Sequence, residues 1–176
     1  DVYKRQGQLL RSTGDMDILV RKEDIMRIKE LLASEGYQPK LIVHEHQEEV
    51  ALKRYKDYTF VHAENRHVIE AHWSLTTNDF GGNFTYAHFQ SQQQSIVIND
   101  HLCTTFGAED LFLTLALHGA RHQFESLKWL ADLNQYTCRY PATDWRRLHQ
   151  KAQSENVETM FLSGVDLAKR MMGADI

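Results

Sequence analysis

Two aspartates, Asp15 and Asp17, follow Gly14 and lead directly into the apolar segment 18–20. Alternate side chains of a strand lie on one face, so these carboxylates would point the same way with Cβ atoms roughly 6–7 Å apart. Like charges at this spacing repel each other unless a cation lies between them. Oxygen ligands suit Mg²⁺ or Mn²⁺, as in sites that handle nucleotides, although such a pair also occurs as turn and edge chemistry at the start of a strand.

A third carboxylate, Glu70, lies in a segment of alternating polar and apolar residues. Segments 57–62 and 67–75 predict a β-hairpin whose turn spans 63–66. If its second arm pairs in the same sheet as the strand of Asp15 and Asp17, the three carboxylates make a two-metal site with ions about 4 Å apart, able to hold a triphosphate and activate a hydroxyl. The alternation is equally consistent with an exposed strand residue at position 70.

The remaining segments predict the elements that must position these residues. Met16, Ile18 and Val20 are expected to face the core, and helical spacing from residue 24 ends at Gly36. Segments 37–43, 49–55 and 95–98 predict strands, and the polar stretch 76–94 predicts a long loop. From about residue 108 onward every segment has a helical period. This order predicts an α+β N-terminal part followed by an α-helical part.

Composition and charge narrow the classes of function. The chain has 176 residues, 42% of them hydrophobic, and a net charge of −4, which describes an ordinary soluble protein and disfavours nucleic acid as a partner. No apolar run approaches the roughly 20 residues that span a bilayer, and no signal peptide is evident. We therefore expect no membrane association and a cytoplasmic location. Cys103 and Cys138 lack paired spacing, which favours reduced thiols.

The first six residues have a separate explanation. Residues 1–6 read DVYKRQ, which is what GATGTGTATAAGAGACAG encodes, the end sequence of a transposon used in sequencing libraries. We interpret them as an adapter and expect the reading frame to be truncated at its N-terminus, so we expect these residues to have no part in the fold. An intact genomic locus that encodes the same residues in frame would refute this interpretation.

Four ordered segments resemble a bacterial nucleotidyltransferase family within the polymerase-beta-like superfamily. They are GDMDILV at 14–20, VIEAHW at 68–73, HGARH at 118–122 and LKWLAD at 127–132. The resemblance covers nearly the whole chain. It implies a nucleotidyltransferase-like mixed sheet with flanking helices over residues 7–98, with its upstream part missing, and an α-helical domain over 99–176 that helps close the nucleotide site. It also implies that Asp15, Asp17 and Glu70 are the three metal-binding carboxylates and that a nucleoside triphosphate is the substrate.

The sequence departs from the superfamily pattern at one point. A Gly-Gly or Gly-Ser element normally precedes the Asp-x-Asp strand and helps to bind the nucleotide phosphates, but none precedes Arg11, and the pair Gly81-Gly82 lies in the wrong place. Truncation explains this absence, and it predicts that the gene product is active while this fragment is impaired. A degenerate, non-catalytic member of the family is the alternative.

Residues that contact the nucleotide are predicted in two separate parts of the chain. Arg11 and Gly14 precede the aspartates, while Arg121 and Lys128 lie in the helical part. A cationic side chain can donate hydrogen bonds to the oxygens of a triphosphate. Arg121 and Lys128 are equally consistent with solvated surface charges.

Ten histidines invite a different metal chemistry. His118 and His122 have the i,i+4 spacing that can clamp Zn²⁺, but no third ligand is evident, which favours support of the helical domain or contact with phosphate. His72 shares a strand face with Glu70 and is either near the metal site or a hydrogen-bonded structural residue.

Together these observations predict a metal-dependent nucleotidyltransferase that uses Mg²⁺ or Mn²⁺ to move a nucleoside monophosphate from a nucleoside triphosphate to a hydroxyl acceptor. Asp15 and Asp17 would bind the metals, and Glu70 would complete the site and help take the acceptor's proton. Two alternatives stay open. One is a nucleotide-binding or regulatory module without catalysis, and the other is a histidine-ligated metal protein.

Overall fold

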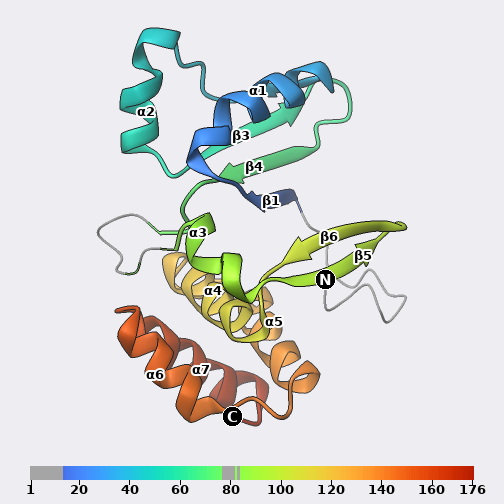
Figure 1. Cartoon of the computed structure of the whole chain (residues 1–176). Coiled ribbons are helices and arrows are strands. Elements are labelled where there is room, and N and C mark those ends of the chain that lie inside the picture. The colour runs from blue at the N-terminus through green and yellow to red at the C-terminus, as the bar shows by residue number, and fades with distance from the viewer. Residues whose placement is uncertain (1–13, 77–81, 83) are drawn as a thin grey trace. The chain divides into compact units, whose positions relative to one another are not determined.

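The structure, a computed structural model, describes residues 14–76, 82 and 84–176, which form two compact units (Figure 1). The first unit contains residues 14–76 and 84–88, and the second contains residues 82 and 89–176. Arg11 and the expected adapter segment lie outside the described residues.

A four-stranded mixed sheet forms the centre of the first unit. Its order is β1-β4-β3-β2, with β1 parallel to β4 and the other pairs antiparallel. The strands are β1 (Asp15–Leu19), β2 (Tyr37–Pro39), β3 (Asp57–His62) and β4 (Val68–His72). The predicted hairpin is confirmed as β3 and β4, and the α+β fold class with its mixed sheet is confirmed as well.

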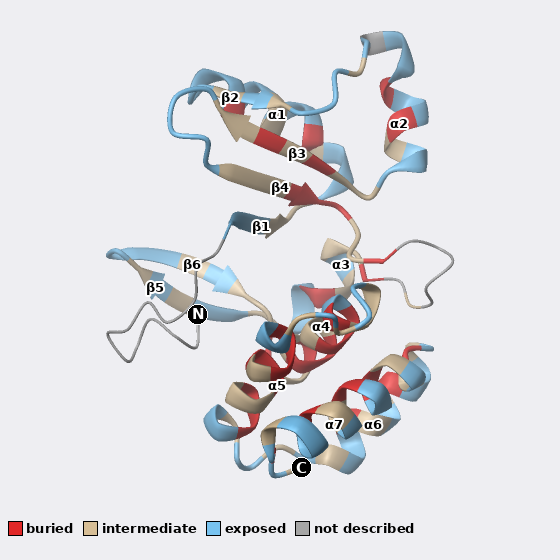
Figure 2. Cartoon of the chain, turned by 180° about the vertical axis from the view of Figure 1, so that it is seen from behind, coloured by how far each residue is buried: buried red, intermediate tan, exposed pale blue. Residues whose placement is uncertain are grey.

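Two helices, α1 (Ile25–Ser34) and α2 (Glu48–Arg54), supply the apolar partners of one sheet face. The core of this unit consists of Ile25, Leu32, Ala51, Tyr58, Phe60, Ala71 and Trp73. Figure 2 shows the buried residues running along β3 and β4. Because side chains alternate along a strand, the residues between these core positions face the opposite side of the sheet. That side carries Asp57, Glu70 and His72.

Helix α2 corrects the prediction of a strand over 49–55. The segment has three apolar residues in a row, a pattern whose periodicity does not separate a strand from a short helix. Ala51 alone among them is buried, while Val50 is 65% exposed. Ion pairs complete the helix: Lys53 bonds Glu49 one turn away, and Lys29 of α1 bonds Glu48 at 2.8 Å.

Other predicted boundaries also differ from the structure. Met16 is 60% exposed although it shares a strand face with Ile18, which packs against the core, because β1 is an edge strand among the described strands. The described part of the predicted loop 76–94 contains α3 (Tyr86–Phe89) and the 3₁₀ turn η5 (Gln90–Gln92). The predicted strand at 95–98 is β5 (Gln94–Ile98), and its partner β6 (His101–Thr105) was not predicted.

Four helices follow the β5–β6 hairpin and confirm the predicted α-helical C-terminal part. They are α4 (Ala108–Arg121), α5 (Leu127–Arg139), α6 (Trp145–Ser154) and α7 (Glu158–Met172). Phe112 of α4 lies at their centre, with ring centroids 4.9 Å from Tyr136, 5.1 Å from Trp145 and 5.7 Å from Phe161. Such edge-to-face contacts add to the burial of apolar area. Within the described part of the chain, no helix has the length and hydropathy needed to cross a bilayer.

Gly107 permits a close approach at the start of α4. A Cβ atom added there would overlap the backbone carbonyl oxygen of Gln92, which cannot swing aside as a flexible side chain could. We expect Gly107→Ala to lower the free energy of unfolding by about 1–3 kcal/mol, the usual cost of overpacking. Chemical denaturation measures this change. Gly14→Ala is the control, because no heavy atom lies within 4 Å of the added Cβ there, and equal stability of the two variants would contradict the prediction.

Candidate metal centre

Asp17 and Glu70 lie side by side on neighbouring strands. The parallel pairing of β1 with β4 places Asp17 opposite Glu70 and Asp15 opposite Val68. Paired residues of adjacent strands point to the same face, so all three carboxylates lie on the side away from the apolar core. The structure therefore juxtaposes two of the three predicted carboxylates directly and places the third on the same face.

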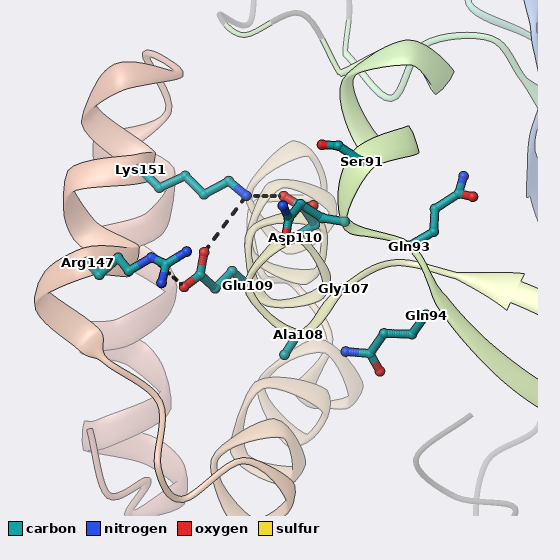
Figure 3. Close-up of a pocket in the computed structure, with 10 residues that line it drawn as sticks. Ser91, Gln93, Gln94, Gly107, Ala108, Glu109, Asp110, Arg147 and Lys151 are labelled. Carbon is teal, nitrogen blue, oxygen red and sulfur yellow. Dashed lines mark hydrogen bonds and ion pairs between the residues drawn. The ribbon is translucent and has the colours of Figure 1, made fainter.

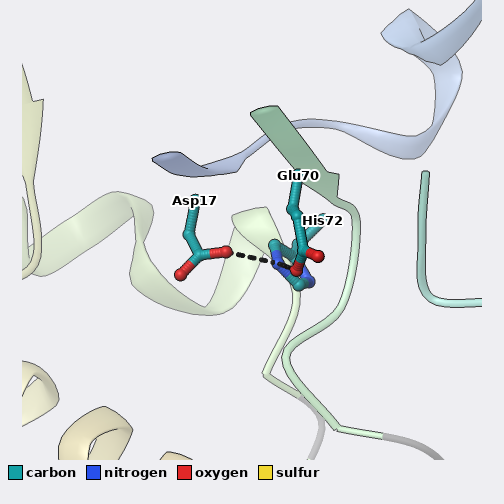
Figure 4. A group of neighbouring side chains, drawn as sticks. All are labelled: Asp17, Glu70 and His72. Carbon is teal, nitrogen blue, oxygen red and sulfur yellow. Dashed lines mark hydrogen bonds and ion pairs between the residues drawn. The ribbon is translucent and has the colours of Figure 1, made fainter. Parts of the chain in front are cut away.

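His72 lies between these carboxylates. Its Nε2 atom is 3.1 Å from Oδ1 of Asp17 and 3.4 Å from Oε2 of Glu70 (Figure 4). Suitable ligand atoms of Asp17, Glu70 and His72 all lie within 4.8 Å of one another, which is close enough to share one metal ion. The imidazole is almost fully buried, whereas the Asp17 side chain is 53% exposed. The centre is therefore buried at His72 and open to solvent at Asp17.

Asp57 lies behind the imidazole. It pairs with His72 across the β3–β4 hairpin, and its Oδ2 atom is 3.5 Å from Nδ1 of His72. Nδ1 is buried and has no hydrogen bond. The same Asp57 oxygen is 3.4 Å from the ammonium group of Lys56. One side of the ring thus faces the two strand carboxylates, and the other faces Asp57.

The carboxylates raise one another's cost of ionisation. Burial raises the pKa of Glu70 above its usual range, the charges of Asp17, Asp57 and Asp15 raise it further, and His72 opposes the shift. This accumulation of negative charge is offset when a cation binds. Two carboxylates and one imidazole are suitable donors for a divalent ion, so the described residues fit a metal.

A protein-family model described as an uncharacterised nucleotidyltransferase matches residues 6–173. The chain belongs to this nucleotidyltransferase family. A search of curated proteins and a search of solved structures found no significant match. The membership confirms the resemblance to nucleotidyltransferases that the sequence motifs indicated.

The other described residues predicted for the site are Gly14, which directly precedes Asp15, and two cations of the helical part. Gly14 is an exposed bend residue directly before β1. Arg121 is the last residue of α4, and Lys128 lies in the first turn of α5 with its ammonium 5.2 Å from the Trp129 ring centroid. Both cations belong to the second unit. Their contact with phosphate stays a prediction.

His118 and His122 pack as an aromatic pair. Their ring centroids are 4.9 Å apart, and His122 stacks on Trp129 at 4.9 Å and 19°. Among residues 14–76, 82 and 84–176, no third His, Cys, Asp or Glu joins them in a group of close ligand atoms. Stacking of this kind matches the predicted support of the helical part.

The sequence analysis did not single out Asp57. The hairpin register contained the signal: an antiparallel pairing of Val61 with Val68 also pairs Thr59 with Glu70 and Asp57 with His72. Any carboxylate at position 57 is therefore brought to the histidine of the second arm. Counting outward from the turn at 63–66 would have identified it.

A second polar site is the α4–α6 pocket, a cavity of about 360 Å³ within the second unit (Figure 3). Its cations are already paired. Lys151 bonds Asp110 at 2.5 Å, and Arg147 lies 3.1 Å from Glu109. These carboxylates offset the positive charge that a phosphate group would need.

Removal of the Glu70 charge is expected to stabilise the metal-free protein. Folding raises the pKa of the Glu70 carboxyl, so at low pH, where the carboxyl is protonated in the folded and the unfolded protein, it costs no stability. As pH rises from the ordinary pKa of 4.5 through the raised pKa of the folded protein, the cost to the free energy of unfolding grows. Glu70→Gln should therefore raise the free energy of unfolding at pH 7 and leave it unchanged near pH 3, and the partial exposure of the side chain limits the gain. Denaturation at both pH values in a metal chelator measures it, and destabilisation at pH 7 would refute it.

Proposed function

We propose that this protein is a metal-dependent nucleotidyltransferase that moves a nucleoside monophosphate from a nucleoside triphosphate to a hydroxyl acceptor and releases pyrophosphate. The observation that carries the proposal is the juxtaposition of Asp17 with Glu70 on the sheet face opposite the core. Membership of a nucleotidyltransferase family over residues 6–173 supports the same reaction class.

Asp15, Asp17 and Glu70 hold Mg²⁺ or Mn²⁺ in this proposal. A divalent ion bound here offsets the charge of the triphosphate and favours ionisation of the attacking hydroxyl. The acceptor oxygen forms a bond to the α-phosphorus, the bond from that phosphorus to the bridging oxygen breaks, and pyrophosphate carries away the electron pair. Glu70 takes the acceptor's proton as general base.

The polar face gives this reaction room within the first unit. Helices α1 and α2 pack on the other side of the sheet, where the apolar residues lie, and Asp17 keeps an exposed side chain. A net charge of −4 disfavours a nucleic acid as the acceptor, so the proposal favours a small molecule, a sugar or a protein side chain.

The test is a panel of radiolabelled nucleoside triphosphates incubated with the full gene product and Mg²⁺ or Mn²⁺. We expect metal-dependent nucleotide binding, together with pyrophosphate release or self-labelling. Binding without turnover across a broad panel of hydroxyl acceptors would favour a regulatory module instead. Absence of metal-dependent nucleotide binding would refute the proposal.

A further inference from the structure

The imidazole of His72 has the burial and the orientation expected of a metal ligand. It is 6% exposed, it points its Nε2 atom at Asp17 and Glu70, and those two side chains are the open edge of the centre. In the metal-free protein Nε2 lies within hydrogen-bonding distance of Oδ1 of Asp17, and the same nitrogen faces the Glu70 carboxylate. The buried Nε2 atom would add a nitrogen ligand to the two carboxylate oxygens.

Asp57 lies where a supporting carboxylate lies in a carboxylate–histidine–metal arrangement. Such a carboxylate accepts the N–H of the ring nitrogen that does not bind the metal, which fixes the tautomer and the ring orientation. Nδ1 of His72 is buried without a hydrogen bond, and its nearest acidic oxygen is Oδ2 of Asp57 at 3.5 Å. A hydrogen bond from Nδ1–H to this oxygen would leave Nε2, the nitrogen that faces Asp17 and Glu70, without a proton and free to bind a metal.

We propose that His72 is a nitrogen ligand of the metal centre and that Asp57 positions its ring, so that the centre prefers Mn²⁺ to Mg²⁺. The proposal rests on the proposed function only in that the same carboxylates bind the metal. Mg²⁺ strongly prefers oxygen ligands and gives up its waters reluctantly, whereas Mn²⁺ is larger and less strongly hydrated and accepts a nitrogen ligand at lower cost. A donor set of two carboxylates and one imidazole therefore discriminates between two ions that three carboxylates alone would bind more equally.

The first test needs no substitution. Electron spin-echo envelope modulation of the full gene product, loaded with less than one equivalent of Mn²⁺, is expected to show coupling to a directly bound ¹⁴N nucleus. Protein grown with ¹⁵N-histidine should show the ¹⁵N pattern instead. Mn²⁺ that binds without nitrogen coupling would overturn the role of His72 and leave the carboxylate site of the proposed function intact. Failure of the protein to bind Mn²⁺ while Mg²⁺ still binds would overturn the role of His72 alone, and failure to bind either ion would overturn both proposals.

Variants assign the coupling to one residue. His72→Gln is expected to abolish it and to weaken Mn²⁺ binding by roughly tenfold or more, while Mg²⁺ binding changes less than about threefold. His44→Gln is the matched control, because His44 is exposed and is not in the close ligand group. Coupling that persists in His72→Gln, or disappears in His44→Gln, would overturn the assignment.

Asp57→Asn tests the positioning role without removing the buried ring. It keeps the shape of the side chain and removes its charge. We expect the nitrogen coupling to remain and Mn²⁺ affinity to fall roughly tenfold, in the range found for partners of ligating histidines. Unchanged Mn²⁺ affinity in Asp57→Asn would overturn the role of Asp57. Circular dichroism melts of each variant establish that the protein is folded when its affinity is measured.

Discussion

Asp17→Asn is expected to reduce nucleotidyl transfer by roughly 10³-fold while leaving the protein folded. The substitution removes the carboxylate charge nearest to both Glu70 and His72, and a metal held by these residues would lose an anionic ligand. The loss of a like charge beside Glu70 also means that the metal-free variant should be at least as stable as the parent. Pyrophosphate release and thermal melting, measured on the same preparations, check both parts.

Asp24→Asn is the matched control for this result. It makes the same change in the same unit, and the Asp24 carboxylate bonds Arg21 rather than the metal centre. Metal binding adds a second signature: saturating Mn²⁺ at about 100 times its dissociation constant should stabilise the parent by about 2.7 kcal/mol. Asp17→Asn should lose most of that gain. Parent-like turnover in Asp17→Asn would refute the catalytic assignment.

Lys151→Met is expected to produce the largest loss of stability. Lys151 bonds Asp110, whose side chain is 1% exposed, in the α4–α6 pocket. Removal of one partner leaves a buried charge uncompensated, which typically costs about 3–5 kcal/mol. We expect a loss near the lower end of this range, because Lys151 is itself 22% exposed and water can reach the site. Denaturation at neutral pH measures it.

Two further variants separate the buried charge from lost packing. Asp110→Leu combined with Lys151→Met replaces the ion pair by apolar groups and should recover most of the lost stability. Lys53→Met makes the same lysine substitution in an exposed pair with Glu49, where we expect less than about 1 kcal/mol. Equal losses in Lys151→Met and Lys53→Met would contradict the role given to burial.

The sequence was sufficient to predict elements whose periodicity extends over many residues. The β3–β4 hairpin and the helices after residue 108 were predicted because alternation and helical spacing are local properties. Helix α2 was predicted as a strand because its apolar residues are consecutive. Strand β6 was missed because His101–Thr105 has one exposed leucine, Leu102, and no apolar face of its own.

The candidate site was predictable in part for a related reason. The alternation of β4 placed Glu70 and His72 on one face, but the parallel pairing with β1 joins segments far apart in the chain and follows from no local pattern. Only the resemblance to nucleotidyltransferases indicated it. Asp57 was hidden in a different way, since its role depends on what lies across the hairpin rather than on its neighbours in sequence.

The separation of the two halves of this centre also orders events during synthesis. Asp17 and His72 are 55 positions apart, and β2, β3 and both helices of the first unit are made between their strands. β1 therefore leaves the ribosome long before β4 exists to receive it. The nascent chain then has two aspartates but not the full set of ligands, and tight binding of a metal ion must wait until β1 pairs with β4. Metal occupancy would then report a finished fold.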